Sequence, residues 1–265
     1  MNKKKLPANL EHYRLAKIEE YRRRKRRAGS FRWVIMLFML LACAAVGYSL
    51  SFSPFFGVEQ VIVSGYKQVS AERLRALSGI ELGQNIFTVN TAQVEKWLNI
   101  EPWVKTAQVD RLLPRIIRIT ITERRPAAVL STGQAFVEID KNGLVLRRMH
   151  ELDNLDLPIL SGIANIHAGV VPGSYLDGKD IGVALTVLNN LPQQAFLAVK
   201  EIDVRDSQKI KLYTEGAIEV RIGGIGDIAA KYLLADSIIY DAQLNGTISQ
   251  ISYIDVSSTA KPVIY

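Results

Sequence analysis

The chain has 265 residues, 48% of them apolar and 22% charged, which is enough for one or two domains with apolar cores. Its net charge of +7 is concentrated in residues 1–32, which contain twelve Lys and Arg against three Glu. The remainder holds 21 of the 33 basic and 23 of the 26 acidic residues, and this near-neutral balance argues against a folded face that binds nucleic acid. The single cysteine, Cys43, excludes an intramolecular disulfide and a metal site built from cysteines.

A long apolar segment follows the basic residues. No residue from Trp33 to Val58 is charged, and the part from Trp33 to Phe52 would form a helix of about 30 Å, which matches the hydrocarbon core of a bilayer. Because the basic residues precede it, the positive-inside rule places the N-terminus in the cytoplasm. We therefore predict a cytoplasmic tail over 1–32 and a transmembrane helix over 33–54, as in a single-pass type II protein of the cell membrane.

Three other interpretations of this region stay open. Ala42–Ala44 resembles a signal-peptide cleavage site, and LLAC ending at Cys43 resembles a lipoprotein acceptor. The apolar run continues past Cys43 to Phe56, however, which favours an uncleaved anchor. The basic run could bind nucleic acid, but its place beside a membrane span favours attraction to anionic lipid, at about 1 kcal/mol per basic residue.

Residues 57–126 predict a small α+β domain. A valine-rich strand before Gly65 is followed by two helices, which Ser70 and Asn90 are expected to cap. A strand that stops at Pro114 comes next, and the segment RIIRITITE then alternates in polarity. The predicted order is strand, helix, helix, strand, strand, and the residues expected on the buried face of the last strand are Ile117, Ile119 and Ile121.

Residues 127–256 predict a β-rich domain with flanking helices, and residues 257–265 a C-terminal tail. A hairpin turns over Asp140–Gly143, and helical spacing of apolar residues recurs near 180–191 and 227–244. Three strands lie between the two helices, with turns at 205–208 and 215–216. A last short strand is expected at 252–256, so the fold class is α+β throughout.

The sequence does not indicate catalytic chemistry. Gly224, Gly226 and Ala229 form a G-x-G-x-x-A pattern between a strand and a helix, but the chain does not otherwise alternate as a dinucleotide-binding fold does. We interpret these glycines as a turn. The three histidines are scattered and no pair has metal-ligand spacing. We therefore predict that the protein is not an enzyme and has no catalytic residues, cofactor or metal.

Several motifs occur in a fixed order along the chain. Residues 57–70 read GVEQVIVSGYKQVS, 83–90 read GQNIFTVN and 112–128 read LLPRIIRITITERRPAA. The later segment adds D-x-x-G from Asp140, L-P-x-L-x-G at 157–162 and ISYIDV at 251–256. Placed after one apolar segment with a basic tail, these motifs resemble the POTRA and β domains of the FtsQ/DivIB family of bacterial cell division proteins.

The resemblance implies a role in septum formation. It implies a scaffold that links early and late division proteins, binds bitopic partners of the FtsB/DivIC and FtsL types and influences septal peptidoglycan synthesis. The alternative is a wall-binding or enzymatic extracytoplasmic protein held by the same anchor. The absence of Trp after residue 126 disfavours a wall-binding groove.

A short strand predicted near the C-terminus indicates where a partner would bind. A strand over 252–256 would lie at a sheet edge, because only a short tail follows it and offers no later segment for pairing. A partner strand could complete that edge by main-chain hydrogen bonds. Ile254 and Val256 are expected to face the core, while Ile251, Tyr253 and Asp255 face the partner. The alternative is an edge strand that the tail merely protects, with Pro262 discouraging pairing. The resemblance adds Arg205, in a turn two strands earlier, and the full set of expected contacts is Arg205, Ile251, Ser252, Tyr253, Ile254, Asp255 and Val256.

Overall fold

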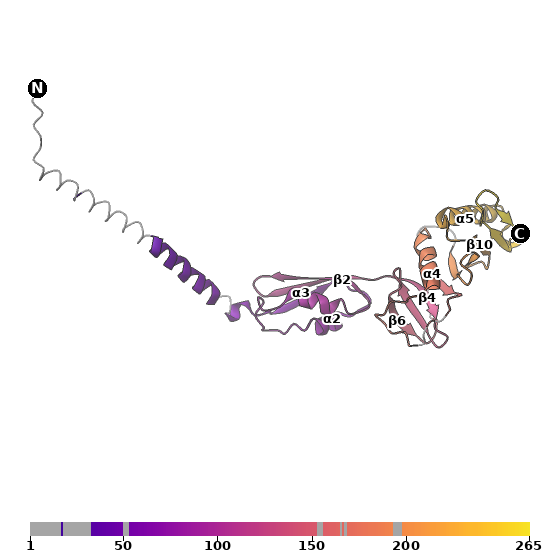
Figure 1. Ribbon diagram of the computed structural model, residues 1–265. Coiled ribbons are helices and arrows are strands. Elements are labelled where there is room, and N and C mark those ends of the chain that lie inside the picture. Colours follow the sequence, from indigo (N-terminus) through magenta and orange to yellow (C-terminus); the bar gives the residue numbers. More distant parts are fainter. Residues whose placement is uncertain are drawn as a thin grey trace, which may run out of the picture. The chain divides into compact units, whose positions relative to one another are not determined.

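The computed structural model describes residue 17 and residues 33–49, 53–152, 156–164, 166, 169–192 and 198–265. Residues 33–49 are helical (Figure 1). Within these ranges, no helix combines the length and the apolar character needed to cross a membrane. The expected span over 33–54 includes residues outside the described ranges, as does nearly all of the tail over 1–32. The anchor therefore stays a prediction.

The first domain has the expected strand and helix order. Its three strands form one sheet in the order β1-β3-β2, and α2 and α3 pack together (Figure 1). The elements are η1 (Pro54–Phe56), β1 (Gln60–Ser64), α2 (Ala71–Ser78), α3 (Thr91–Leu98), β2 (Val104–Leu112) and β3 (Ile116–Glu123).

Local hydrogen bonds begin and end the two helices as expected. The Ser70 hydroxyl accepts the Arg73 N–H at 3.2 Å, and the Asn90 side chain accepts the Gln93 N–H at 3.1 Å. Each bond satisfies a backbone donor that the first turn leaves unpaired. Gly79 ends α2 in the left-handed conformation, with φ of 62°.

Glu123, the last residue of β3, fastens the loop that leads into α2. Its carboxylate accepts the backbone N–H groups of Lys67, Gln68 and Val69 at 2.8–3.0 Å. Burial raises the pKa of Glu123, but these three donors and the Lys67 charge outweigh it, so the pKa lies below its ordinary value. One side chain thus ties the end of the last strand to the start of the first helix.

Glu123→Gln should loosen this loop in a pH-dependent way. The folded pKa is below the unfolded one, so the stabilisation is complete above the ordinary value of 4.5 and is lost as the pH falls through the folded pKa. We expect the substitution to cost about 1 kcal/mol at neutral pH, because the carboxylate is partly screened by solvent. Hydrogen exchange of the Lys67–Val69 amides should quicken, whereas exposed Glu72→Gln should leave it unchanged. Equal exchange in both variants would refute the role of Glu123.

The alternating pattern of β3 buries the residues that the sequence predicted. Ile117, Ile119 and Ile121 are at most 3% exposed, while Thr120 is exposed on the other face. Ile119→Asp should therefore destabilise the first domain by about 3–5 kcal/mol, because it buries an unpaired carboxylate. Thr120→Asp is the matched control on the solvent side of the same strand. Hydrogen exchange of the β3 amides measures both, and similar protection in the two variants would contradict the face assignment.

Three short segments form the end of the first domain at which the chain enters, which we call the proximal end (residues 53–60, 81–89 and 111–116). Contacts between residues place these segments in one compact unit. Val58 donates its N–H to Gln84 O at 2.8 Å, and Glu59 donates to Arg115 O at 2.8 Å. The proximal end is thus joined by backbone hydrogen bonds.

The second domain is built on a nine-stranded mixed sheet. The strand order is β12-β11-β10-β9-β8-β7-β4-β5-β6. The pairs β4–β7, β7–β8 and β10–β11 are parallel, and the other pairs are antiparallel. The elements are β4 (Pro126–Ser131), β5 (Phe136–Asp140), β6 (Val145–Met149), β7 (Ile159–Ser161), α4 (Lys179–Asn190), β8 (Val199–Asp203), β9 (Ile210–Thr214), β10 (Glu219–Gly223), α5 (Ile228–Leu244), η2 (Ile248–Gln250), β11 (Tyr253–Asp255) and β12 (Val263–Ile264).

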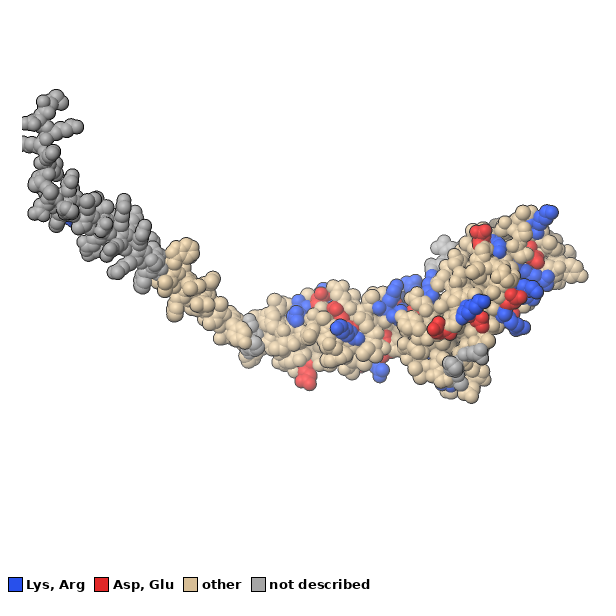
Figure 2. Space-filling view, viewed as in Figure 1, with Lys and Arg blue, Asp and Glu red and all other residues tan. Residues whose placement is uncertain are grey.

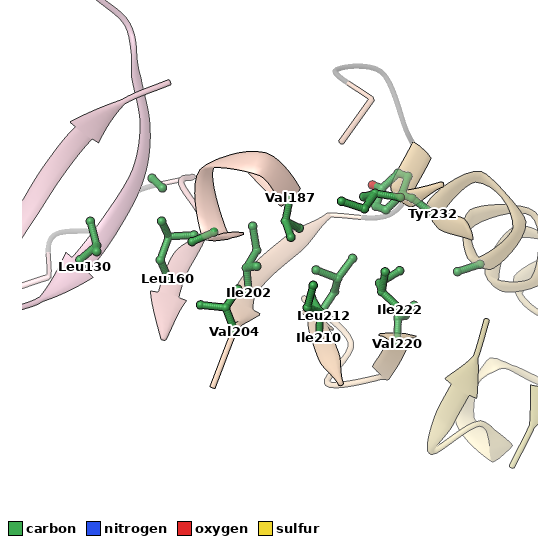
Figure 3. Packing of buried hydrophobic residues seen from close by; sticks show 14 of the residues in the cluster. Leu130, Leu160, Val187, Ile202, Val204, Ile210, Leu212, Val220, Ile222 and Tyr232 are labelled. Atoms are coloured by element: carbon green, nitrogen blue, oxygen red, sulfur yellow. The ribbon is translucent and has the colours of Figure 1, made fainter. Parts of the chain in front are cut away.

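Helices α4 and α5 cover one face of this sheet. The hydrophobic core of the domain lies between these helices and the strands. Figure 3 shows Val187 of α4 and Tyr232 of α5 above the inward side chains of the strands, among them Ile202, Leu212 and Ile222. The inward residues of α5 recur every three or four positions, as one face of a helix requires. The opposite face of β8–β11 is polar and partly exposed. The core therefore fixes the strands from one side and leaves the other side available.

Candidate partner-binding site

The last strands end the sheet in a way that the sequence did not predict. The expectation that no later segment pairs with the strand at 252–256 is wrong, because β12 runs antiparallel to β11, with Ile254 opposite Ile264. Tyr253 and Tyr265 exchange two backbone hydrogen bonds, both 3.0 Å long. The tail thereby supplies partners for backbone groups of β11 that would otherwise face solvent. The sheet edge is therefore β12.

The two faces of β11 are largely as expected. Ile254 and Val256 are fully buried in the core, and Tyr253 and Asp255 lie on the opposite face. The expectation that Ile251 shares the Tyr253 face is wrong, since Ile251 packs against the core cluster. It follows η2 directly, and the alternation of the strand starts only after it.

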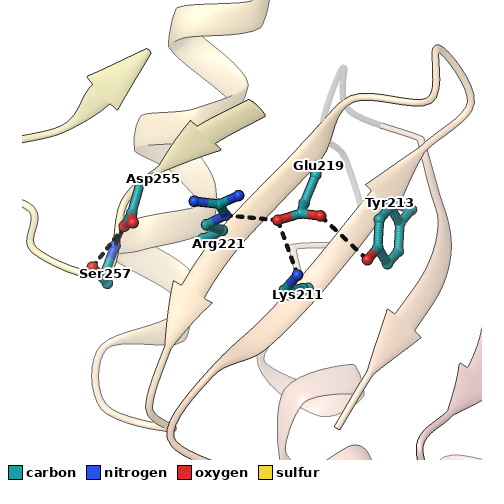
Figure 4. A network of polar contacts seen from close by, with 6 residues as sticks. All are labelled: Lys211, Tyr213, Glu219, Arg221, Asp255 and Ser257. Carbon is teal, nitrogen blue, oxygen red and sulfur yellow. Dashed lines mark hydrogen bonds and ion pairs between the residues drawn. The ribbon is translucent and has the colours of Figure 1, made fainter. Parts of the chain in front are cut away.

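A network of polar contacts covers the outer face of β9, β10 and β11 (Figure 4). Glu219 accepts hydrogen bonds from Arg221 Nε at 2.6 Å, Lys211 Nζ at 3.2 Å and the Tyr213 hydroxyl at 3.3 Å. Burial raises the pKa of Glu219, but the bonds from Arg221 and Lys211 outweigh it and lower the pKa. Burial and the Glu219 charge raise the pKa of Tyr213. Glu219 is therefore held ionised at the centre of the network.

Arg221 connects this network to two stacked tyrosines. Its guanidinium carbon lies 3.8 Å from the centre of the Tyr253 ring, a cation–π geometry. The Tyr253 and Tyr265 rings stack with centroids 5.3 Å apart and an angle of 19°. The hydrogen bond to Glu219 raises the pKa of Arg221, so the stack carries a fixed positive charge. Tyr265, at its outer end, is 73% exposed.

Asp255 and Arg205 lie toward one end of the sheet. Asp255 accepts the N–H and the hydroxyl of Ser257 at 2.9 and 2.6 Å, which starts the turn toward β12. Arg205 follows β8, and β8, β10 and β11 run in the same direction, so their C-terminal ends share this end. Arg205 is exposed, with an ion pair to Asp203 at 3.9 Å. It is separated from β11 by β9 and β10.

Sequence reasoning missed Glu219, Arg221 and Tyr265. The alternation of β10 could have placed Glu219 and Arg221 on the same face as Tyr253 once their strands were paired. The residues that flank the short β11 also belong to the ladder, since Ser252 N–H donates to Tyr265 O and Val256 N–H donates to Arg221 O. Tyr265 gave no signal, because a strand of two residues shows no alternation.

The first two glycines of the loop before α5, Gly223 and Gly224, lie close to other parts of the chain. The loop lies in a β10–α5–β11 crossover, so the G-x-G-x-x-A pattern does occupy one β-α-β unit. A side-chain carbon on Gly223 would lie 2.9 Å from Ser257 Cβ, and one on Gly224 would lie 3.2 Å from Gln208 Oε1. Of the two glycines in the pattern, a close approach therefore accounts for Gly224, whereas a side-chain carbon on Gly226 would meet no atom within 4 Å.

No group of three or more His, Cys, Asp or Glu in the described part of the chain could hold a metal ion. His12 and His167 lie outside that part.

Comparison with known proteins decides the family. Residues 56–124 match the family model "POTRA domain, FtsQ-type", and residues 128–257 match "Cell division protein FtsQ/DivIB, C-terminal". The cell division protein FtsQ of Syntrophotalea carbinolica is 30% identical over 84% of this chain and 78% of its own length. The chain belongs to the FtsQ/DivIB family of cell division proteins.

Two further similar proteins are a second relative and one solved structure. The cell division protein DivIB of Clostridium botulinum strain Hall is 27% identical over 95% of this chain and 97% of its own length. Among solved structures, the major extracytoplasmic domain of DivIB from Geobacillus stearothermophilus matches 47% of this chain and 98% of its own, with 22% identity and a TM-score of 0.32.

Deleting Pro262–Tyr265 should open the edge of β11 without releasing β11 from β10. The Tyr253 N–H, which donates to Tyr265 O, should exchange faster with solvent. The Val256 N–H donates to Arg221 O at 2.9 Å and should stay protected, which provides an internal control. Hydrogen exchange followed residue by residue measures both amides. Unchanged protection of Tyr253 would show that β12 does not pair in solution.

Proposed function

We propose that this FtsQ/DivIB-family protein is a membrane-anchored, non-enzymatic scaffold of the division machinery. Residues 33–54 anchor it, residues 1–32 stay in the cytoplasm beside anionic lipid, and the domains over 57–126 and 127–256 lie outside at the septum. It binds bitopic partners of the FtsB/DivIC and FtsL types and so links early and late division proteins to septal peptidoglycan synthesis. Family membership and the charge asymmetry of residues 1–58 support this proposal.

The observation that carries the partner site is the short exposed edge at β12. Tyr265 pairs inward with Tyr253, and residues of a strand alternate in direction, so the N–H and C=O of Ile264 point away from the sheet. Val263, Ile264 and Tyr265 are each more than half exposed. A strand from a partner can therefore add to β12 by main-chain hydrogen bonds. Pro262 has no N–H to offer at the next outward position.

Both faces beside this edge offer side-chain contacts. On the outer face lies the stack of Arg221, Tyr253 and Tyr265. On the other face, a cavity of about 460 Å³ lies between α5 and β12 and includes Ile251 and Ile264 in its lining. Alternate side chains of an added strand would meet the stack and the cavity in turn. Ile251 thus keeps a place in the proposed site, on the face opposite Tyr253.

The remaining predicted contacts have different places in this proposal. Tyr253 contributes its ring to the stack on the outer face. Asp255 stabilises the turn toward β12 through Ser257, and Ser252 donates its N–H to Tyr265 O. Ile254 and Val256 support the site from the core. Arg205 would offer a positive charge to a partner segment that extends along the same end of the sheet.

The test is co-purification from membranes with the FtsB/DivIC-type partner. Tyr253→Ala should weaken binding about tenfold or more, as expected for a central aromatic contact, and Ile264→Pro should weaken it by removing the outward N–H. Tyr175→Ala, at another tyrosine that is 61% exposed, is the matched control. Circular dichroism checks that each variant is folded.

Two further variants complete the test. Full partner binding by a folded chain truncated after Gln250 would refute the proposed site. Tighter binding after deletion of Pro262–Tyr265 would place the partner strand on β11 itself, with β12 as a displaceable cover.

A further inference from the structure

The proximal end of the first domain (residues 53–60, 81–89 and 111–116) carries an apolar surface that the partner site does not use. Phe55, Leu82, Phe87 and Leu113 are 60%, 70%, 45% and 58% exposed. Single exposed apolar residues are ordinary on a soluble surface. These four come from three separate segments of one compact unit. The Phe56 ring lies 5.2 Å from the Phe55 ring and 5.1 Å from the Phe87 ring, so two of the segments are in direct contact. Exposed apolar residues grouped in this way are typical of an interaction surface.

The backbone of the proximal end makes internal hydrogen bonds. Gly83 N–H donates to Val58 O at 2.7 Å, and Ile86 N–H donates to Phe56 O at 2.8 Å. Arg111 turns its guanidinium inward and donates to Ile86 O at 2.9 Å and to Val89 O at 2.6 Å. These peptide groups have partners within the domain, so the cost of bringing them near an apolar medium is reduced.

The charges at the proximal end are balanced. Arg115 forms an ion pair with Glu59 at 3.0 Å, and Arg111 is held by carbonyl oxygens. Glu81 is exposed beside Leu82. With two acidic and two basic side chains at this end, apolar contact and not net charge would drive an association.

The covalent chain ties this surface to the apolar segment. Residues 33–49 are helical and uncharged, and Ser53 follows Ser49 by only four residues. An extended chain covers at most about 3.6 Å per residue, so Ser53 lies within about 14 Å of the end of that helical stretch. Figure 2 shows tan, uncharged atoms where the chain enters the first domain.

We propose that the proximal end rests in the outer surface of the lipid bilayer, with Phe55, Leu82, Phe87 and Leu113 at the boundary between headgroups and acyl chains. Side chains of this kind bind at that depth in interfacial proteins. The lipid surface is the occupant because the chain cannot carry this end away from the membrane. The inference rests on the proposed function for one premise, the anchor over 33–54. It adds that the first domain is held in a fixed orientation on the membrane and is not merely tethered to it.

The test measures the depth of single labelled positions in the full-length chain. Cys43→Ser removes the only cysteine, and Leu82→Cys or Leu113→Cys then carries an environment-sensitive fluorophore. The chain is reconstituted alone in phosphatidylcholine vesicles, with or without nitroxide-labelled lipid. Ile100→Cys is the control, because Ile100 is also well exposed, at 73%, but lies at the other end of β2 from Leu113. The nine residues of β2 span about 30 Å.

We expect blue-shifted emission at positions 82 and 113 that the nitroxide lipid quenches more strongly than emission at position 100. Equal, weak quenching at the three positions in a chain that resists carbonate extraction would overturn this inference and leave the anchor intact. A blue shift without lipid quenching would also overturn it, because protein would then cover the surface. Release of the chain by carbonate would refute the anchor, and with it both proposals.

Discussion

Burial of Ile254 and Val256 is the contact on which the C-terminal end of the sheet depends. Two parallel strands need a crossover connection, and α5 supplies it between β10 and β11 while covering the core face of both. Because Ile254 and Val256 are fully buried, a shift of β11 by one residue would move both side chains to the solvent face. The position of Tyr253, the turn at Asp255 and the return of the tail all follow from this fixed register.

The outer face of the same strands shows how a polar surface can be ordered. Glu219 collects three donors, and the most firmly held of them, Arg221, also lies over the Tyr253 ring. The guanidinium is thereby fixed from two directions, which reduces the entropy lost when another group docks against it. A preorganised stack beside a short exposed edge is a favourable place for a partner strand, because the edge supplies backbone bonds and the stack supplies selectivity.

The proximal end and the β12 edge carry different kinds of surface. The proximal end exposes aliphatic and aromatic side chains over satisfied backbone groups, whereas the β12 edge exposes backbone groups beside ordered side chains. A bilayer cannot satisfy backbone hydrogen bonds, but a protein strand can. The chemistry of each surface is therefore consistent with the neighbour proposed for it, lipid for the proximal end and a polypeptide strand for the β12 edge.

Much of the fold was predictable because it rests on local signals. The helix caps at Ser70 and Asn90, the alternation of Ile117 and Ile119 and the hairpin turn after Asp140 each act within a few residues. The candidate site was predictable only in part. The faces of Tyr253 and Ile254 follow from alternation, but the side on which Ile251 packs depends on the 3-10 turn before it, which has no strong sequence pattern.

The sequence by itself determined the order of the elements in the first domain, the family, the apolar segment before the domains and the buried face of the last strands. These depend on side-chain periodicity, caps and motif order, which are properties of neighbouring residues. Only the tertiary structure decided that Val263 and Ile264 form the edge, that Arg221 lies between Glu219 and Tyr253, and that three distant segments make the proximal end. The reason is physical: a two-residue strand is stabilised by the unpaired edge that it meets and not by its own sequence, so its existence depends on a strand placed elsewhere in the fold.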